Sequence, residues 1–386
     1  LDRPDVVAVT AITAMVPDAL AICRAAKRVD PGILTVMGNV HPTFMWRELL
    51  GGHPELDVVV RGEGEQTIAE LMTAVAARAD LDRVAGLAYR RQGLPRATAD
   101  RPFAELDELV AAWDLIDWPQ YFYRPHPEGR LAIVNSSRGC VKRCSFCSQQ
   151  KFWNQTWRGR APEQFVAELE MLRDRHDVRV VMLSDETPTV EQERWARILD
   201  LCIERRLGVE ILMETRVDDI LRDEALLPRY REAGVSHIYV GVEATDQKTL
   251  DLYLKDTKIE ESKRAIELIN EHGIVSETSF VLGTPEETAE SIATTVELAK
   301  WYEPDMAFFL AIAPWPYADI YPALAEHVAS DDYRRYNLVE PVVKPIAMTL
   351  EEMQRALAKA TGHFFRDKFE RLDTLFLVRM ITAGDY

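Results

Sequence analysis

Six short apolar stretches alternate with helical patterns over the second half of the 386-residue chain, and this alternation constrains the fold more than any other feature. We expect strands at 131–135, 179–183, 209–214, 237–242, 278–282 and 306–311, separated by helices at 162–175, 191–205, 224–233, 259–272 and 286–301. Such an alternation predicts a parallel sheet, because each crossover helix returns the chain to the start of the next strand. A partial (β/α) barrel is the simplest closure, and a doubly wound sheet is the alternative.

A shorter alternation of the same kind comes first in the chain. Strands are expected at 6–10, 33–37 and 58–60, and helices at 17–29, 44–50 and 65–78. Three units are few for a doubly wound domain, and the sequence starts at Leu1 without a methionine, so we expect it to be a fragment. The expected domains are 1–79, a proline-rich linker at 80–129, the barrel at 130–322 and a helical extension at 323–386, with its last helix at 349–369.

Composition restricts the partners and the compartment. The net charge of −17 disfavours nucleic acid as a partner, and no apolar run is long enough for a transmembrane helix. Only the stretch from Arg130 to Arg160 is strongly basic, and it holds three of the five cysteines. Cys23 and Cys202 lie in helical patterns and are expected to pack as apolar residues. Few, unevenly spread cysteines disfavour a disulfide scaffold, so we expect reduced thiols and a cytoplasmic protein.

Cys140, Cys144 and Cys147 follow the first expected barrel strand with the spacing C-x3-C-x2-C. Three thiolates on a short loop can ligate three irons of a cubane cluster and leave the fourth iron open to another ligand. The alternatives are a structural zinc site, which needs a fourth ligand, and unligated core cysteines. His126 and His176, the nearest histidines, lie 14 and 29 residues from the closest cysteine, so the iron–sulfur cluster is favoured.

This motif, with an aromatic residue before its last cysteine, resembles the radical S-adenosylmethionine (SAM) superfamily. The resemblance implies a 4Fe–4S cluster whose open iron binds SAM, and reductive cleavage of SAM to a 5′-deoxyadenosyl radical. Arg216 and Glu243 would hold the SAM carboxylate and ribose, and Gly283 would admit the adenine. After the second strand only the acidic part of the family's glycine-rich contact matches. The residues that the resemblance assigns to SAM are Phe146, Asp185, Glu186, Arg216, Glu243 and Gly283.

The first 79 residues resemble a Rossmann-like cobalamin-binding domain that is truncated at its N-terminus. His41 lacks the neighbours of a cobalt-ligating histidine, and a sheet that binds no cofactor is the alternative. The fold expected for the chain is therefore α/β, with a partial (β/α)6 radical SAM barrel after this domain and a helical C-terminal tail. Small and polar residues at strand ends would contact the cobalamin: Thr10, Gly38, Asn39, Gly62 and Glu63.

Nearly the whole chain is similar to the anaerobic magnesium-protoporphyrin IX monomethyl ester oxidative cyclase family, and segments 147–153, 215–220, 313–317 and 344–348 carry the match. The resemblance implies a radical oxidation, with cobalamin, that closes a ring on a tetrapyrrole, a small-molecule substrate, and a reducing donor such as flavodoxin or ferredoxin. The sequence departs from the cyclase pattern at 186–189, 242–246 and 308–312. Two alternatives stay open: a cobalamin-dependent radical SAM methyltransferase of a natural product or lipid, and a non-catalytic metal-binding module.

Overall fold

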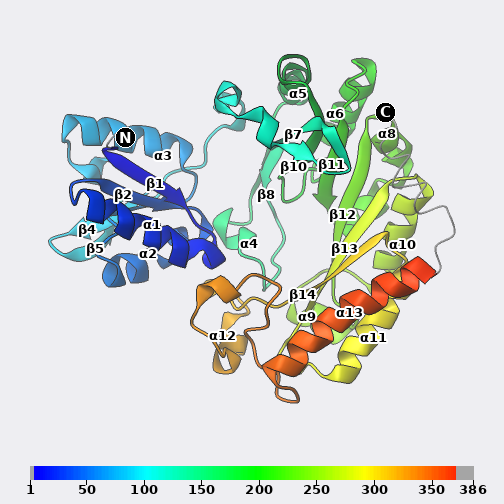
Figure 1. Ribbon diagram of the computed structural model, residues 1–386. Helices are drawn as coiled ribbons and strands as arrows, with labels where there is room; N and C mark the ends of the chain where they lie inside the picture. The colour runs from blue at the N-terminus through cyan, green and yellow to red at the C-terminus, as the bar shows by residue number, and fades with distance from the viewer. Residues whose placement is uncertain (1–3, 371–386) are drawn as a thin grey trace. The chain divides into compact units, whose positions relative to one another are not determined.

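The computed structural model describes residues 4–370, of which 126–128 by their backbone alone, and the chain divides into two compact units (Figure 1). Within the described residues, unit 1 comprises 4–109 and 313–343, and unit 2 comprises 110–312 and 344–370. The domain boundaries expected from the sequence stay a prediction. Residues 1–3 of the expected cobalamin-binding domain and 371–386 of the expected C-terminal extension lie outside the described residues.

Unit 1 is built on a five-stranded sheet of order β1-β2-β3-β4-β5, in which the first three strands are parallel. The three expected strands and the three expected helices are all present. The antiparallel hairpin β4-β5 extends the sheet from the segment expected to be a linker. Pro95 is tolerated in β5 because this strand lies at the sheet edge. The elements are β1 (Val6–Thr10), α1 (Val16–Val29), β2 (Leu34–Gly38), α2 (Val40–Gly52), β3 (Val58–Val60), α3 (Glu65–Ala77), β4 (Leu87–Arg91), β5 (Leu94–Ala97) and α12 (Tyr321–Leu324).

Unit 2 is built on a sheet of order β14-β13-β12-β11-β10-β7-β6, which curls into a partial barrel. All six expected barrel strands are present and parallel, and the two-residue β6 (Phe122–Tyr123) adds an antiparallel edge. The strands follow one another in chain order without a reversal, which excludes the doubly wound alternative. The barrel strands are β7 (His126–Val134), β10 (Val178–Leu183), β11 (Glu210–Thr215), β12 (Val235–Glu243), β13 (Val275–Leu282) and β14 (Met306–Ala311).

Helices cover the outer face of this sheet because every second strand residue is apolar and packs against them. Val181, Met213 and Ile238 belong to one buried cluster with residues of the helices, such as Ile198 and Leu268. The helices of unit 2 are α4 (Gln149–Phe152), α5 (Pro162–His176), α6 (Gln192–Glu204), α7 (Val217–Arg222), α8 (Leu227–Glu232), α9 (Gln247–Leu252), α10 (Ile259–Glu271), α11 (Ala289–Tyr302) and α13 (Leu350–Glu370).

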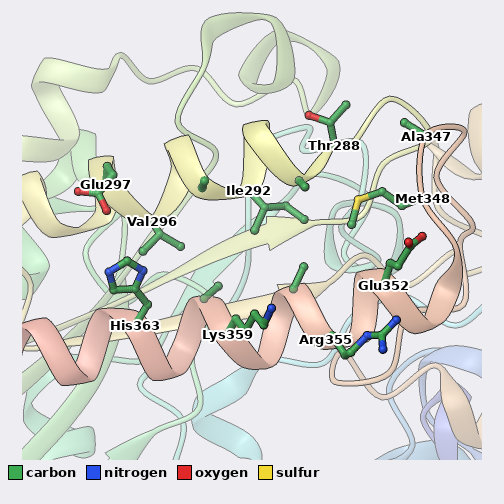
Figure 2. A pocket seen from close by; sticks show the side chains of 14 residues that line it. Thr288, Ile292, Val296, Glu297, Ala347, Met348, Glu352, Arg355, Lys359 and His363 are labelled. Carbon is green, nitrogen blue, oxygen red and sulfur yellow. The ribbon is translucent and has the colours of Figure 1, made fainter.

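The last helix of the described chain packs along α11. Its start carries the expected capping box, in which Thr349 N donates to Glu352 Oε2 at 2.8 Å and Glu352 N donates to Thr349 Oγ1 at 3.2 Å. A groove of about 570 Å³ lies between α11 and α13, with Ile292 and Val296 among its lining residues (Figure 2). No helix within residues 4–370 is both long and apolar enough to cross a membrane.

Candidate functional site

The three clustered cysteines lie on the loop that follows β7, at the carboxyl end of the barrel strands, which is the end where barrel proteins place their chemistry. We call residues 136–148 the cysteine loop. Cys144 is buried, whereas Cys140 and Cys147 are partly exposed. Burial raises the pKa of the Cys147 thiol to about 12, and the neighbouring Cys144 and Cys140 add to the rise. A thiolate at Cys147 therefore requires a bound metal or a nearby cation.

A short hairpin that the sequence did not reveal closes the base of the cysteine loop. β8 (Ser137–Gly139) pairs antiparallel with β9 (Trp157–Gly159), and Gly139 lies opposite Trp157. Gly139 has a φ of +106°, and a Cβ at this position would lie 2.1 Å from the Thr156 carbonyl oxygen. Only glycine fits this close approach of two backbones.

Asp185 is completely buried under the cysteine loop. Its Oδ1 accepts a hydrogen bond from Ser136 N at 2.8 Å, and its Oδ2 accepts from Ser136 Oγ at 2.7 Å and Ser137 Oγ at 2.5 Å. Burial raises the pKa of Asp185 to about 6, although these three hydrogen bonds oppose the rise. The Asp185 carboxylate, which is expected to contact SAM, thus accepts hydrogen bonds from a backbone N–H and two hydroxyl groups at the start of the cysteine loop.

Glu186 has a similar structural use. Its Oε2 accepts from Gly139 N at 2.9 Å, and its Oε1 accepts from Trp153 Nε1 at 2.6 Å. The two acidic residues after β10 therefore connect the start of the cysteine loop, and Trp153 beyond its end, to the barrel. The contacts expected between these two residues and SAM stay a prediction.

Arg216, directly after β11, places a guanidinium with one unpartnered nitrogen beside the cysteines. Its Nε donates to Asp218 Oδ1 at 2.9 Å, whereas its Nη2 is buried and has no hydrogen-bond partner among the described residues. Burial alone would lower the pKa of Arg216, but Asp218 and the sulfurs of Cys144 and Cys140 raise it. A buried guanidinium N–H without a partner fits the carboxylate of a ligand, as expected for SAM.

Glu243 ends β12 in an unusual backbone conformation. Its φ is +70°, and the register of β12 with β13 shifts between Gly241 and Glu243. Glu243 Oε1 accepts from Lys255 Nζ at 3.0 Å in a nearly dry environment. A Cβ on Gly241 would lie 2.3 Å from Glu243 Oε1, so the glycine makes room for this ion pair. A non-glycine residue held at positive φ is strained, and such strain is frequent at functional sites.

The segment after α9 anchors the other side of the cysteine loop. Ser145 N donates to the Tyr253 carbonyl at 2.9 Å, Ser145 Oγ donates to the Leu252 carbonyl at 2.7 Å, and the Phe146 ring packs edge-on against Tyr253. Sequence reasoning missed both Tyr253 and Lys255. In the sequence they could have been noticed only as an aromatic and a basic residue that follow Glu243, the last residue of its strand, by about ten positions.

Gly283 lies at the end of β13 with a φ of +93°. Its N–H donates to Glu287 Oε2 at 3.0 Å, and a Cβ would lie 3.2 Å from Met353 Cε. A side chain at this position would therefore be strained and would crowd Met353. The contacts expected with SAM for Phe146, Glu243 and Gly283 stay predictions.

Three of the residues expected at cobalamin meet at the carboxyl edge of the sheet in unit 1. Thr10 and Gly38 are register partners at the ends of β1 and β2, and Asn39 Nδ2 donates to Thr10 Oγ1 at 2.9 Å. Ile12 and Met15, on the segment after β1, are about half exposed. Ligands of open α/β sheets bind outside this edge, and a mixture of polar groups and exposed apolar groups fits a corrin.

The other residues considered at this edge have local partners. Gly62 N donates to Thr43 Oγ1 at 3.0 Å, and Glu63 Oε2 accepts from Ala104 N at 2.8 Å. His41 is buried, its Nδ1 lies 3.1 Å from Thr13 Oγ1, and burial lowers its pKa to about 4. His41 is therefore a neutral core residue at physiological pH.

A single metal ion requires several ligands that converge on one point, whereas a cubane cluster takes each cysteine at a different iron. No three His, Cys, Asp or Glu side chains within residues 4–370 are close enough to hold one ion. The cysteine loop thus offers separated sulfurs next to the cation of Arg216.

Family models match both units. The model of the radical SAM superfamily matches residues 134–299, and that of the B12 binding domain matches residues 2–72. The chain therefore belongs to the radical SAM superfamily, in the group whose members also carry a cobalamin-binding domain. These two domains imply a 4Fe–4S cluster, SAM and cobalamin as cofactors.

Individual relatives show which kinds of radical SAM protein the chain is similar to. The anaerobic magnesium-protoporphyrin IX monomethyl ester cyclase of Rubrivivax gelatinosus is 42% identical over 371 residues, which are 95% of this chain and 66% of that protein. The chain thus spans slightly less than two thirds of this relative. An uncharacterized methyltransferase of Pyrococcus horikoshii is 29% identical over 94% of this chain and 79% of its own length.

A solved structure shares the fold of both units. The radical SAM methyltransferase TsrM of Kitasatospora setae, with cobalamin and a [4Fe–4S] cluster bound, superposes with a TM-score of 0.69. The superposition covers 92% of this chain and 74% of that one, at 18% sequence identity. It supports the assignment of the fold and carries no information on the substrate.

Proposed function

We propose that the chain is a radical SAM enzyme that uses cobalamin to oxidise a tetrapyrrole in the manner of its cyclase relative. The buried and unpartnered N–H of Arg216 beside the cysteine loop carries the SAM-dependent part of this proposal. The identity of 42% with the cyclase supports the tetrapyrrole part. When bound, the 4Fe–4S cluster supplies the electron for reductive cleavage of SAM.

The residues of the chain have separate roles in this proposal. Cys140, Cys144 and Cys147 hold three irons, Arg216 binds the carboxylate of SAM, and Glu243 binds its ribose. The backbone at Gly283 and the ring of Phe146 flank the remainder of SAM. Asp185 and Glu186 act one step away, because they hold the loop that carries the cysteines. Thr10, Gly38, Asn39, Gly62 and Glu63 form the edge that receives cobalamin.

The electron must come from outside the chain. A small reduced redox protein, such as a flavodoxin or ferredoxin, is the proposed donor, and the cytoplasm is the proposed compartment because it keeps the thiols reduced. The test measures the release of 5′-deoxyadenosine with flavodoxin or ferredoxin as the donor and compares it with the release driven by a chemical reductant.

The central test is reconstitution with iron and sulfide without oxygen, followed by mass spectrometry of the SAM products. Each of Cys140→Ala, Cys144→Ala and Cys147→Ala should lose the cluster absorbance near ~400 nm and the formation of 5′-deoxyadenosine, because two thiolates hold a cubane poorly. Cys202→Ala is the matched control, since Cys202 is a buried cysteine of α6 in the barrel core. Retention of both signals in any loop variant rejects the ligand set.

A methyltransferase is the second candidate, and the similarity to the Pyrococcus horikoshii protein over 79% of its length favours it. A methyltransferase consumes a further SAM as methyl donor, so S-adenosylhomocysteine appears beside 5′-deoxyadenosine. A cyclase forms no S-adenosylhomocysteine. A fully loaded cluster that neither binds nor cleaves SAM would instead support the non-catalytic metal-binding module.

A further inference from the structure

The inner face of the curled sheet in unit 2 has an apolar side. Ile133 on β7 and Met182 on β10 are register partners, and both point away from the helix-covered face. Their exposed fractions are 53% and 46%, which are large values for apolar residues in the middle of a parallel sheet. Exposed apolar side chains at such a place indicate a surface that an apolar ligand covers.

The opposite side of the same face is acidic. In the strand register, Glu214 on β11 lies beside Tyr239 on β12, and Tyr239 lies beside Glu277 on β13. The Tyr239 hydroxyl is hydrogen-bonded to Ser279 Oγ, which fixes the tyrosine between the two glutamates. We call Glu214 and Glu277 the acidic wall.

The two glutamates of the acidic wall differ in their partners. Glu277 Oε2 lies 2.6 Å from His237 Nε2. Glu214 is exposed on the inner face, and neither a hydrogen bond nor an ion pair joins it to another described residue. Partial desolvation at the inner face raises the pKa of Glu214 to about 7, with further contributions from Glu186, Asp185, Glu243 and Glu277.

A carboxylate of this kind selects against other carboxylates. A second negative charge close to Glu214 would add to the repulsion that the neighbouring glutamates already exert, and like charges brought together in a desolvated site cost several kcal/mol. A neutral ester avoids the repulsion, and its carbonyl oxygen can accept a hydrogen bond from the Tyr239 hydroxyl. The acidic wall therefore discriminates by charge, whereas Ile133 and Met182 discriminate only by apolar contact.

We infer that Glu214 and Glu277 are specificity-determining residues of the substrate site, which accept the neutral ester group of a porphyrin and reject the corresponding carboxylate. The apolar macrocycle would lie on Ile133 and Met182. This inference rests on the proposed function, since it takes the substrate to be a tetrapyrrole ester.

The test compares two ligands that differ only at one group: magnesium protoporphyrin IX monomethyl ester and magnesium protoporphyrin IX with both carboxylic acids free. Their dissociation constants are measured by fluorescence titration of the full chain at pH 8. The wild-type protein should bind the ester at least about tenfold more tightly. Glu214→Gln should bind the free acid more tightly and reduce the ratio several-fold, with the affinity for the ester nearly unchanged.

Glu210→Gln is the matched control. Glu210 lies on the same strand at its amino end, where its carboxylate accepts from Ser236 Oγ, and its substitution should leave the ratio as in the wild type. Thermal unfolding of each variant shows whether it is folded. Glu277→Gln tests the other glutamate of the acidic wall by the same ratio of dissociation constants.

The outcomes separate the inference from the proposed function. Binding of neither porphyrin overturns the tetrapyrrole proposal and, with it, the inference. Tight binding of both ligands at equal affinity overturns the inference alone. A wild-type preference for the ester that Glu214→Gln and Glu277→Gln leave unchanged also overturns it, because another part of the site would then discriminate.

Discussion

Glu243 Oε1 lies 3.0 Å from Lys255 Nζ, and neither side chain keeps more than 10% of its exposure. In Lys255→Met the Glu243 carboxylate would remain buried without its cation, which should lower the free energy of unfolding of unit 2 by roughly 3–5 kcal/mol. Denaturant unfolding measures this loss. The double variant Lys255→Met/Glu243→Gln should recover most of the stability and still bind SAM weakly. Full SAM affinity in that double variant would show that Glu243 does not bind SAM.

Gly139→Ala should prevent assembly of the cluster site. The new Cβ would meet the Thr156 carbonyl oxygen at 2.1 Å, so the β8-β9 hairpin would have to open. Gly273→Ala is the control, because Gly273 also has a positive φ, of +67°, but no atom lies within 4 Å of its Cβ position. We expect a cost of about 1–2 kcal/mol for the control and normal iron content. Equal iron content in the two variants would contradict the structural role of the hairpin.

The stability of unit 2 should depend on pH through Asp185. Its pKa is raised from 3.8 to about 6 in the folded state, so the folded protein binds a proton more tightly than the unfolded chain. The free energy of unfolding should therefore rise as the pH falls from 7 towards 4, by about 2–3 kcal/mol from this group. Asp185→Asn should remove this increment, which is measured as the difference between the two unfolding curves. Parallel pH profiles of the two proteins would contradict the assignment.

Discrimination between the porphyrin ester and the free acid should also depend on pH. Glu214, with a pKa of about 7, is charged above that pH and neutral below it, so rejection of the free acid is present at pH 8 and is lost as the pH falls towards 6. His237, Tyr239 and Glu277 lie on the neighbouring strands. The ratio of the two dissociation constants in Glu214→Gln isolates the contribution of Glu214, because only the wild type should show its titration.

The sequence predicted the barrel well because strand formation there depends on local patterns. Each strand alternates between residues that pack on helices and residues of the inner face, and each helix has its own apolar stripe. The hairpin β4-β5 lies in the segment expected to be a linker, and its strands belong to a sheet only because they add to that of unit 1, which is a contact that local patterns do not show.

Roles at the site were harder to predict than elements. The role of Arg216 at SAM, expected from the family resemblance and its strand-end position, stays a prediction, which its unpartnered N–H supports. Asp185 has the same kind of position, but its carboxylate accepts a hydrogen bond from Ser136, which lies 49 residues earlier in the chain. Whether a strand-end carboxylate faces a ligand or the backbone beneath it depends on such distant contacts, which no local spacing records.

Unit 1 takes its last part from residues 313–343, which follow the sixth barrel strand in the chain. Within this unit Tyr317 is hydrogen-bonded to Thr13 at 2.7 Å, and Arg334 contacts Asp18. Synthesis therefore begins with unit 1, but the residues that complete this unit are made only after the six barrel strands. During synthesis the growing chain must keep the side chains that later meet Tyr317 and Arg334 available while residues 110–312 are made, so unit 1 can be completed only after most of unit 2 has left the ribosome.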